Sequence, residues 1–592
     1  MTWTIVTDPL GNLGLSALMA AIPIFYLFWA LAVKRMKGHW AAISAVVIAV
    51  VVAIAGYGMP VHLALLSTFN GMLFGLWPVA WIVVTAVFIY NLSVRTGQFE
   101  VIKNSLASIS DDRRMQALLI AFSFGAFLEG AAGFGTPVAI SAAMLAGLGF
   151  VPLYAAGICL LANTAPVAFG AIGIPIIVAG QVSGVDTMAI SQMVGRTLPF
   201  LSVLIPLYLV ILMSGWKKGL EVWPAALVSG GSFALTQFFS SNYLGPMLPD
   251  ILSSIASIVC TVIFLKLWHP KESWRFPHEE KAAGREKLRY TGGQVFRAWT
   301  PFILLSIFVA AWGVKPIKEF LDHYTLFKFQ ISGLHNMVIR GDKPMAAVYA
   351  FNLLSAAGTA ILLAGLFSIP VMGASVSTAA KVAGETFYTL RWPIVTIATI
   401  LGFAYIMNFS GMAVTLGLAF AATGKFFPFF SPFLGWLGVF MTGSDTSTNA
   451  LFGKLQEVTA TKIGVDPVIT VSGNTAGGVC GKMISPQSIA VATAATNLVG
   501  REGDIFRFTL KHSLILTTVI ALMSYAFAYV IPWIVPIYEK AHATAAGLPT
   551  KAAAAFNPAV GGTYLLIALA VVVLITILAS VMGREKAANV SS

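Results

Sequence analysis

The chain has 592 residues, of which 58% are hydrophobic and only 10% are charged. Soluble domains carry roughly 25% charged residues, so this composition excludes a soluble domain, and recurring apolar runs of about 18 or more residues predict an all-α polytopic membrane protein rather than a β-barrel. The net charge of +13 is typical of basic cytoplasmic loops and is poor evidence for nucleic-acid binding, so we expect a lipid bilayer and no nucleic acid as its surroundings.

The N-terminal part of the chain contains ordinary predicted spans. Residues 1–12 carry Asp8 and no Lys or Arg, unlike a signal peptide, so the first apolar run is predicted to be a retained span. That span ends at Lys34 and Lys37, and positive residues mark the cytoplasmic side, which predicts a periplasmic N-terminus. The ordinary spans predicted in this half are 13–33, 40–57, 61–92, 196–215, 221–241 and 246–267.

Between these spans, an apolar run holds Glu129 among glycines, with Pro137 following. Glycine and proline break helices, and a bare carboxylate at bilayer depth costs about 2.5 kcal/mol or more. Broken backbone at that depth needs protein or a water-filled cavity around it. We therefore predict that 116–147 is a re-entrant hairpin whose tip, Phe127–Pro137, lines a site. The alternative is a kinked ordinary span with Glu129 near an interface.

The run 150–183 is predicted to be one crossing made of two half-helices. It is interrupted by Asn163-Thr-Ala-Pro166 and again near Gly170, Gly173 and Pro175. These breakers are too closely spaced for a continuous helix.

A basic segment, 269–294, is predicted to be a cytoplasmic loop. It divides the chain into an N-terminal membrane half, 1–268, and a C-terminal membrane half, 295–592. Residues 315–343 are predicted to lie outside, and Arg584 and Lys586 predict a cytoplasmic C-terminus. The ordinary spans predicted in the second half are 295–314, 345–367, 392–412, 513–536 and 562–583.

A second interrupted unit occupies 431–500. Its first run, 431–452, contains the polar stretch Thr442–Asn449 and forms the second predicted hairpin. The following run is predicted to break at Gly473–Gly478 and again at Ser485-Pro486. With this unit the prediction is about thirteen crossings and two hairpins.

The two interrupted units repeat one pattern. The string N-T-A-x4-G-x4-P begins at Asn163 and again, with the same spacing, at Asn474. Chance is the alternative, because small residues are common in spans. The charge-based topology brings the first unit in from the cytoplasm and the second from outside, so the repeats are predicted to be inverted. Inverted repeats with broken helices are typical of secondary transporters, whose substrate site lies where the broken ends meet.

Cofactors and metals are not indicated. The three cysteines, Cys159, Cys260 and Cys480, lie in apolar surroundings without a CxxC pair. We predict neither a disulfide framework, nor a metal site, nor a bound cofactor.

Four long strings carry a family resemblance. They are FLEGAAGFGTPVAI (127–140), LLANTAPVAFGAIGIPI (160–176), SPFLGWLGVFMTGSDTSTNALFG (431–453) and GGVCGKMISPQSIAVA (477–492). With them the chain resembles the bacterial L-lactate permease family. The resemblance implies proton-coupled import of L-lactate, glycolate and D-lactate across the bacterial inner membrane, in an elevator-type ion-transporter fold. It leaves the oligomeric state open, with a homodimer among the options.

The residues independently favour a site for a small carboxylate. Half-helix N-termini offer free N–H groups and a positive dipole end to an anion. Lys482 is a lone cation in a glycine-rich stretch, and the alternative for it is snorkelling to an interface. The polar residues predicted to bind substrate at the breaks, together with Lys482, are Asn163, Thr164, Asn474, Thr475, Ser485 and Gln487.

Glu129 and Asp445 are the predicted proton-coupling residues, because burial and a nearby cation move a carboxyl's proton affinity in opposite directions. Two alternatives remain for Asp445. It could help to hold Na⁺ with neighbouring hydroxyls at Ser444, Thr446 and Ser447, or it could pair with Lys482 in the empty state.

Other functional classes fit less well. An intramembrane hydrolase would need a nucleophile and base or a metal cluster, and the chain has no G-x-S-x-G and no HExxH motif, so an enzyme is not expected. A Na⁺-coupled carboxylate transporter and an anion channel remain the alternatives to a proton symporter.

Overall fold

The computed structural model describes residues 2–34, 36–133, 135–276, 290–538 and 558–582. Within these ranges ten helices are long and apolar enough to cross a membrane, and four shorter apolar helices accompany them. The prediction of a mostly helical, multi-pass membrane protein is confirmed at this level. Half of the predicted cytoplasmic loop (277–289) and the basic C-terminal tail from residue 583 lie outside the described residues.

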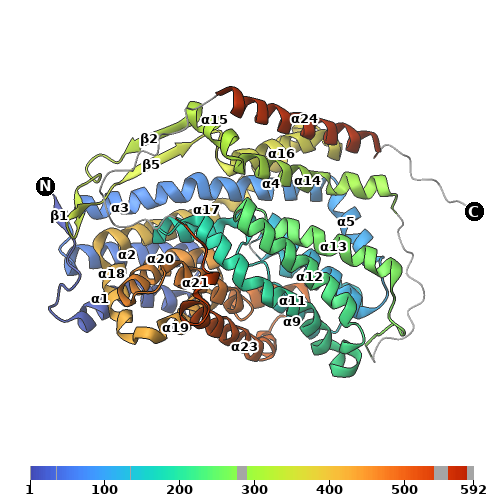
Figure 1. The fold of residues 1–592 in the computed structure, drawn as a ribbon, viewed down its shortest axis with the longest axis horizontal. Coiled ribbons are helices and arrows are strands. Elements are labelled where there is room, and N and C mark those ends of the chain that lie inside the picture. The colour runs from blue at the N-terminus through green and yellow to red at the C-terminus, as the bar shows by residue number, and fades with distance from the viewer. Residues whose placement is uncertain (1, 35, 134, 277–289, 539–557, 583–592) are drawn as a thin grey trace, which may run out of the picture.

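One set of helices, here called the first helix group, surrounds the larger hydrophobic cluster. In Figure 1, α24 lies along the upper edge of the molecule, with α16, α14 and α4 below it. The members of the group are α1 (Leu13–Phe28), α2 (Gly38–Val51), α3 (Val61–Phe74), α4 (Trp81–Arg95), α5 (Gln98–Ala107), α14 (Gly292–Gly313), α15 (Lys315–Thr325), α16 (Ala357–Met372), α17 (Val376–Ser410), α18 (Met412–Phe420) and α24 (Pro558–Met582).

The remaining helices form the second helix group, most of whose buried side chains gather in a separate cluster. Parts of α7, α10, α13 and α20 pack into the first cluster, and there the two groups meet. The members are α6 (Arg113–Gln116), α7 (Gly125–Ala131), α8 (Thr136–Gly147), α9 (Pro152–Ala162), α10 (Ile174–Ser183), α11 (Thr187–Leu220), α12 (Trp223–Phe239), α13 (Pro249–Leu267), α19 (Phe427–Thr442), α20 (Asp445–Ile463), α21 (Pro467–Lys482), α22 (Pro486–Ala495) and α23 (Glu502–Tyr529).

Short strands correct the purely helical prediction. Strands β1 (Trp3–Thr4), β3 (Val338–Arg340) and β4 (Lys343–Pro344) form one sheet, in which β1 runs parallel to β3. Strands β2 (Leu326–Gln330) and β5 (Val348–Asn352) form an antiparallel pair, with Leu326 opposite Asn352. The predicted span 345–367 is therefore wrong at its N-terminal end, where the structure has strand β5 and the helix begins only at Ala357. Aromatic and β-branched residues in β2 and β5 favour strands. Strand β2 lies in the predicted outer segment 315–343, whereas the residues of β5 were taken for part of the apolar span 345–367.

Another difference concerns residues 368–391, which connect the predicted spans 345–367 and 392–412 and were expected to lie on the cytoplasmic side. The structure has one helix of 35 residues, α17, which ends where Gly411 adopts a left-handed backbone conformation with φ of 90°. The helix continues through Lys381 and Arg391. Most side chains in this N-terminal part of α17 are exposed or half-buried, and polar residues on an exposed face do not interrupt a helix.

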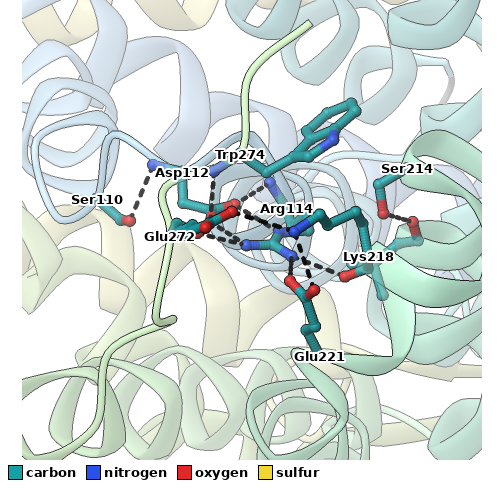
Figure 2. Close-up of polar contacts among 9 residues, drawn as sticks. Ser110, Asp112, Arg114, Ser214, Lys218, Glu221, Glu272 and Trp274 are labelled. Carbon is teal, nitrogen blue, oxygen red and sulfur yellow. Dashed lines mark hydrogen bonds and ion pairs between the residues drawn. The ribbon is translucent and has the colours of Figure 1, made fainter.

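A buried ion-pair cluster, here called the Arg114 cluster, fixes the root of the first hairpin (Figure 2). The Arg114 side chain is 0% exposed, and its Nη2 lies 2.6 Å from Oδ2 of Asp112. The same guanidinium donates to the backbone carbonyls of Lys218 and Glu272 and to the carboxylate of Glu221. It therefore joins the start of the hairpin to the end of α11 and to the chain that follows α13.

Replacing Arg114 with methionine is expected to lower the stability of the protein by roughly 3–5 kcal/mol, because Asp112 is left as an unpaired buried charge. Thermal unfolding in detergent measures this effect. Arg95→Met is the control, since Arg95 is an exposed residue at the end of α4 and its variant should unfold close to the parent. Equal unfolding temperatures for the parent and Arg114→Met would show that the cluster does not stabilise the hairpin root.

Candidate functional site

Four helices begin around one place in the protein. Helices α8 and α10 follow Gly135 and Gly173, whose backbones are left-handed, with φ of 84° and 73°. Helices α20 and α22 are capped by Ser444 and Ser485, whose hydroxyls accept hydrogen bonds from the backbone N–H groups of Ser447 and Ser488. Helix α10 packs on α20 and α8 on α22. Helix N-termini carry unpaired N–H groups and a positive dipole end, so this arrangement suits an anion.

A cavity of about 660 Å³ lies between these N-termini and the first helix group. Glu129, Asp445, Lys482 and Gln487 line it from the second group, together with the polar turn 442–447. From the first group it is lined by residues of α17 between Trp392 and Leu401 and by the connection between α1 and α2. The connection includes the exposed Lys37, so the cavity reaches the protein surface there.

The centre of the cavity wall is an ion pair between the two halves of the chain. Lys482 Nζ lies 2.7 Å from Oε1 of Glu129, and the two side chains are 11% and 3% exposed. Asn163 donates from Nδ2 to the other carboxylate oxygen of Glu129, at 3.2 Å. Lys482 is the last residue of α21, where the helix dipole favours a cation. In the structure, Lys482 therefore pairs with Glu129, and it neither snorkels to an interface nor pairs directly with Asp445.

Asp445 lies on the same cavity but has a different environment. Its Oδ2 accepts a hydrogen bond from Asn449 at 3.4 Å. Its Oδ1 lies against Gly478 of α21, so closely that a Cβ added to Gly478 would be 2.2 Å from this oxygen. This Oδ1 has no hydrogen-bond partner among the described residues. Asp445 is 4% exposed, so it is a buried carboxylate with free acceptor capacity at the edge of the cavity.

Two of the residues predicted to bind substrate, Asn474 and Thr475, lie behind the cavity wall. Both donate to Oδ1 of Asn449, each at 2.8 Å, and so hold the residue that bonds Asp445. The prediction of a break at Gly473–Gly478 is wrong, because α21 is continuous through these residues. Glycine serves close packing here: a Cβ on Gly477 would lie 2.0 Å from the carbonyl oxygen of Pro432 in α19.

The actual interruption lies between α21 and α22, at 483–485. In the first unit the corresponding interruption does start at Asn163, which ends α9. The buried Ser485 caps α22 and does not line the cavity, whereas Gln487 does. Thr164 is buried, and no hydrogen bond to its hydroxyl is present in the described part of the chain. Glu129, Asp445, Lys482 and Gln487 are thus the predicted residues that meet at the cavity.

Sequence reasoning missed Asp250, in the first turn of α13. It is 2% exposed and lies against Gly130, the residue after Glu129. An acid inside the predicted apolar span 246–267 was the available signal, since it is the same signal that identified Glu129. Trp392 and His39, whose rings stack at 4.2 Å beside the cavity, were also missed, because neither stands out in a membrane sequence.

Among the described residues, no group of three or more His, Cys, Asp or Glu side chains has an arrangement that could hold a metal ion. Cys159, Cys260 and Cys480 are free thiols there.

The chain is similar to known proteins over most of its length. The L-lactate permease family profile matches residues 16–531. The chain is 54% identical over 563 residues to an L-lactate permease of Bacillus subtilis, covering 90% of this chain and all of that one. It is 53% identical over 552 residues to the glycolate permease GlcA of Escherichia coli, covering 90% and 99%.

A solved structure of MtrF from Neisseria gonorrhoeae aligns with a TM-score of 0.48 at 12% identity, over 83% of this chain and 95% of the other. The family match covers both interrupted units and the residues that line the cavity, and the resemblance seen in the sequence is confirmed: the chain belongs to the L-lactate permease family.

Proposed function

We propose that this protein imports L-lactate and the related 2-hydroxy monocarboxylates glycolate and D-lactate by proton symport across the bacterial inner membrane. The observation that carries the proposal is the buried Glu129–Lys482 pair on the wall of a cavity that receives four helix N-termini. The relatives named as L-lactate and glycolate permeases supply the substrate class.

The ion pair supports a simple coupling rule. While Glu129 is ionised, it neutralises Lys482, and a substrate anion would enter the site as an uncompensated charge. Such a charge costs about 2.5 kcal/mol or more at membrane depth. Protonation of Glu129 releases Lys482 to the substrate carboxylate, so one proton accompanies one anion. Asn163, Asn474 and Thr475 position the two acids, Gln487 offers the substrate a hydrogen bond, and Ser485 caps α22.

The two helix groups support movement of the second against the first, as in an elevator. At the end of the cavity away from Lys37, polar contacts join the groups. Gln181 donates to the Tyr405 hydroxyl at 2.8 Å, and Asn408 donates to the Val182 carbonyl at 3.2 Å. Because basic loops mark the cytoplasm, the Lys37 end is assigned to the cytoplasm and this state to the inward-facing one.

The same charge rule supports a periplasmic N-terminus and a cytoplasmic C-terminus, with about thirteen crossings. The halves 1–268 and 295–592 act as inverted repeats on either side of the cytoplasmic loop 269–294. A homodimer stays one option for the assembly.

Uptake by purified protein in proteoliposomes tests the function. An imposed pH gradient, acid outside, at equal Na⁺ is expected to drive lactate to a higher concentration inside than outside. Accumulation that follows a Na⁺ gradient at constant pH would replace the proton with Na⁺, held beside Asp445. Equilibration without accumulation would indicate an anion channel.

A further inference from the structure

Asp250 is a buried carboxyl group that the coupling rule does not use. It lies in the first turn of α13, is 2% exposed and does not line the cavity. Neither of its carboxyl oxygens has a hydrogen-bond partner among the residues that the structure describes. Buried polar groups are normally bonded, so two free oxygens on one carboxyl group require an explanation.

The residues around Asp250 indicate its role. Helix α13 packs on α7, and a Cβ added to Gly130 would lie 2.8 Å from Cβ of Asp250. The absence of a side chain at Gly130 therefore lets Asp250 approach the turn that carries Glu129. Asp250 is near enough to Glu129 and Lys482 to interact electrostatically with both.

The other segments packed on α13 add little charge. Helix α12 and the segment Ala117–Phe124 contain no titratable side chain, and the segment Ser240–Leu244 contributes Tyr243, which is exposed. An ionised Asp250 would thus be a buried charge without a donor, which is costly, whereas the neutral carboxyl group both donates and accepts hydrogen bonds.

We propose that Asp250 is the positioning residue that receives Glu129 when substrate takes its place on Lys482. In the empty site Glu129 is ionised and bonds Lys482. When Glu129 gains a proton from the cavity, its ion pair is lost, and the two neutral carboxyl groups of Glu129 and Asp250 then bond each other. No proton leaves Asp250 in this step. Glu129 thus has two positions, one bonded to Lys482 and one bonded to Asp250, and the free oxygens of Asp250 are the acceptors for the second position. The inference rests on the proposed proton symport and extends it to a second carboxyl group.

The test compares Asp250→Asn with Asp250→Val in proteoliposomes. The amide can still accept a hydrogen bond from protonated Glu129, so Asp250→Asn should keep the pH profile of the parent. Valine cannot, so the pH of half-maximal uptake should move about one unit to the acid side, corresponding to about tenfold weaker stabilisation of the protonated form. Ser253→Ala, which removes a buried hydroxyl one turn further along α13, is the matched control and should leave the profile unchanged.

A second measurement does not depend on uptake or on the folding of the valine variant. Adding lactate to the purified parent should change the infrared C=O band of a protonated carboxyl group, and Asp250→Asn should lose part of that change. Parent-like pH profiles for the valine variant, or an unchanged infrared difference in Asp250→Asn, would overturn the inference. A parent protein without pH-driven accumulation would instead overturn the proposed function itself.

Discussion

Replacing Lys482 with alanine is expected to weaken lactate binding by about 60-fold or more while leaving a folded protein. The substrate carboxylate loses its countercharge inside the membrane, which costs about 2.5 kcal/mol or more. Lys37 cannot substitute, because it lies at the exposed mouth of the cavity, whereas Lys482 lies on the wall beside Glu129. Lactate binding to purified protein, measured by calorimetry or by the rise in unfolding temperature with added lactate, gives the magnitude.

The chain offers a matched control in Lys454. This lysine is also mostly buried, with 15% of its side chain exposed, and it pairs with Glu457 away from the cavity. Lys454→Ala should therefore bind lactate with the affinity of the parent. The double variant Lys482→Ala, Glu129→Gln removes both charges and should unfold at a higher temperature than Lys482→Ala alone, because no unpaired carboxylate remains. If Lys482→Ala binds lactate as the parent does, this lysine is not the countercharge.

The ion pair shows which part of the site a sequence can predict. Glu129, Asp445 and Lys482 were identified individually because charges are costly in an apolar segment, and this rule needs only local sequence. The pairing of Glu129 with Lys482 joins residues 353 positions apart, and it depends on how the two halves meet. Local composition contains no information about that contact, and the sequence pointed only to Asp445, in the same half of the chain, as a partner for Lys482.

Glycine was the least reliable signal for the fold. At Gly173 it does permit a left-handed turn before α10, as the prediction of an interrupted helix required. At Gly477 the same residue type allows α19 and α21 to touch, and the helix continues. Both uses require the absence of Cβ, and the sequence does not distinguish them. Asn474 and Thr475 were therefore assigned to a break when they support Asn449 from within a helix.

Glu129→Gln is expected to stop net uptake driven by a pH gradient while exchange of internal for external lactate continues. Glutamine resembles the protonated acid, so Lys482 stays free to bind the substrate and the loaded carrier can move. The empty carrier would have to move with Lys482 unpaired, and this step is blocked by the cost of the charge. Exchange does not require that step. Wild-type net uptake by this variant would remove Glu129 from the proton path and leave it as a hydrogen-bonding residue of the hairpin.

Asp445→Asn should instead lose both net uptake and exchange. Asp445 is a carboxyl group that lines the cavity together with Lys482 and Glu129, and it lies at the first position of α20. Once Glu129 is protonated, the Asp445 carboxyl group orients the Lys482 side chain toward the cavity without forming an ion pair with it, so its replacement affects every loading event. Measuring both activities in the same proteoliposomes for both variants separates the two acids. Exchange at the parent rate in Asp445→Asn would show that Lys482 is oriented without it, and Asp445 would then be a structural partner of Asn449.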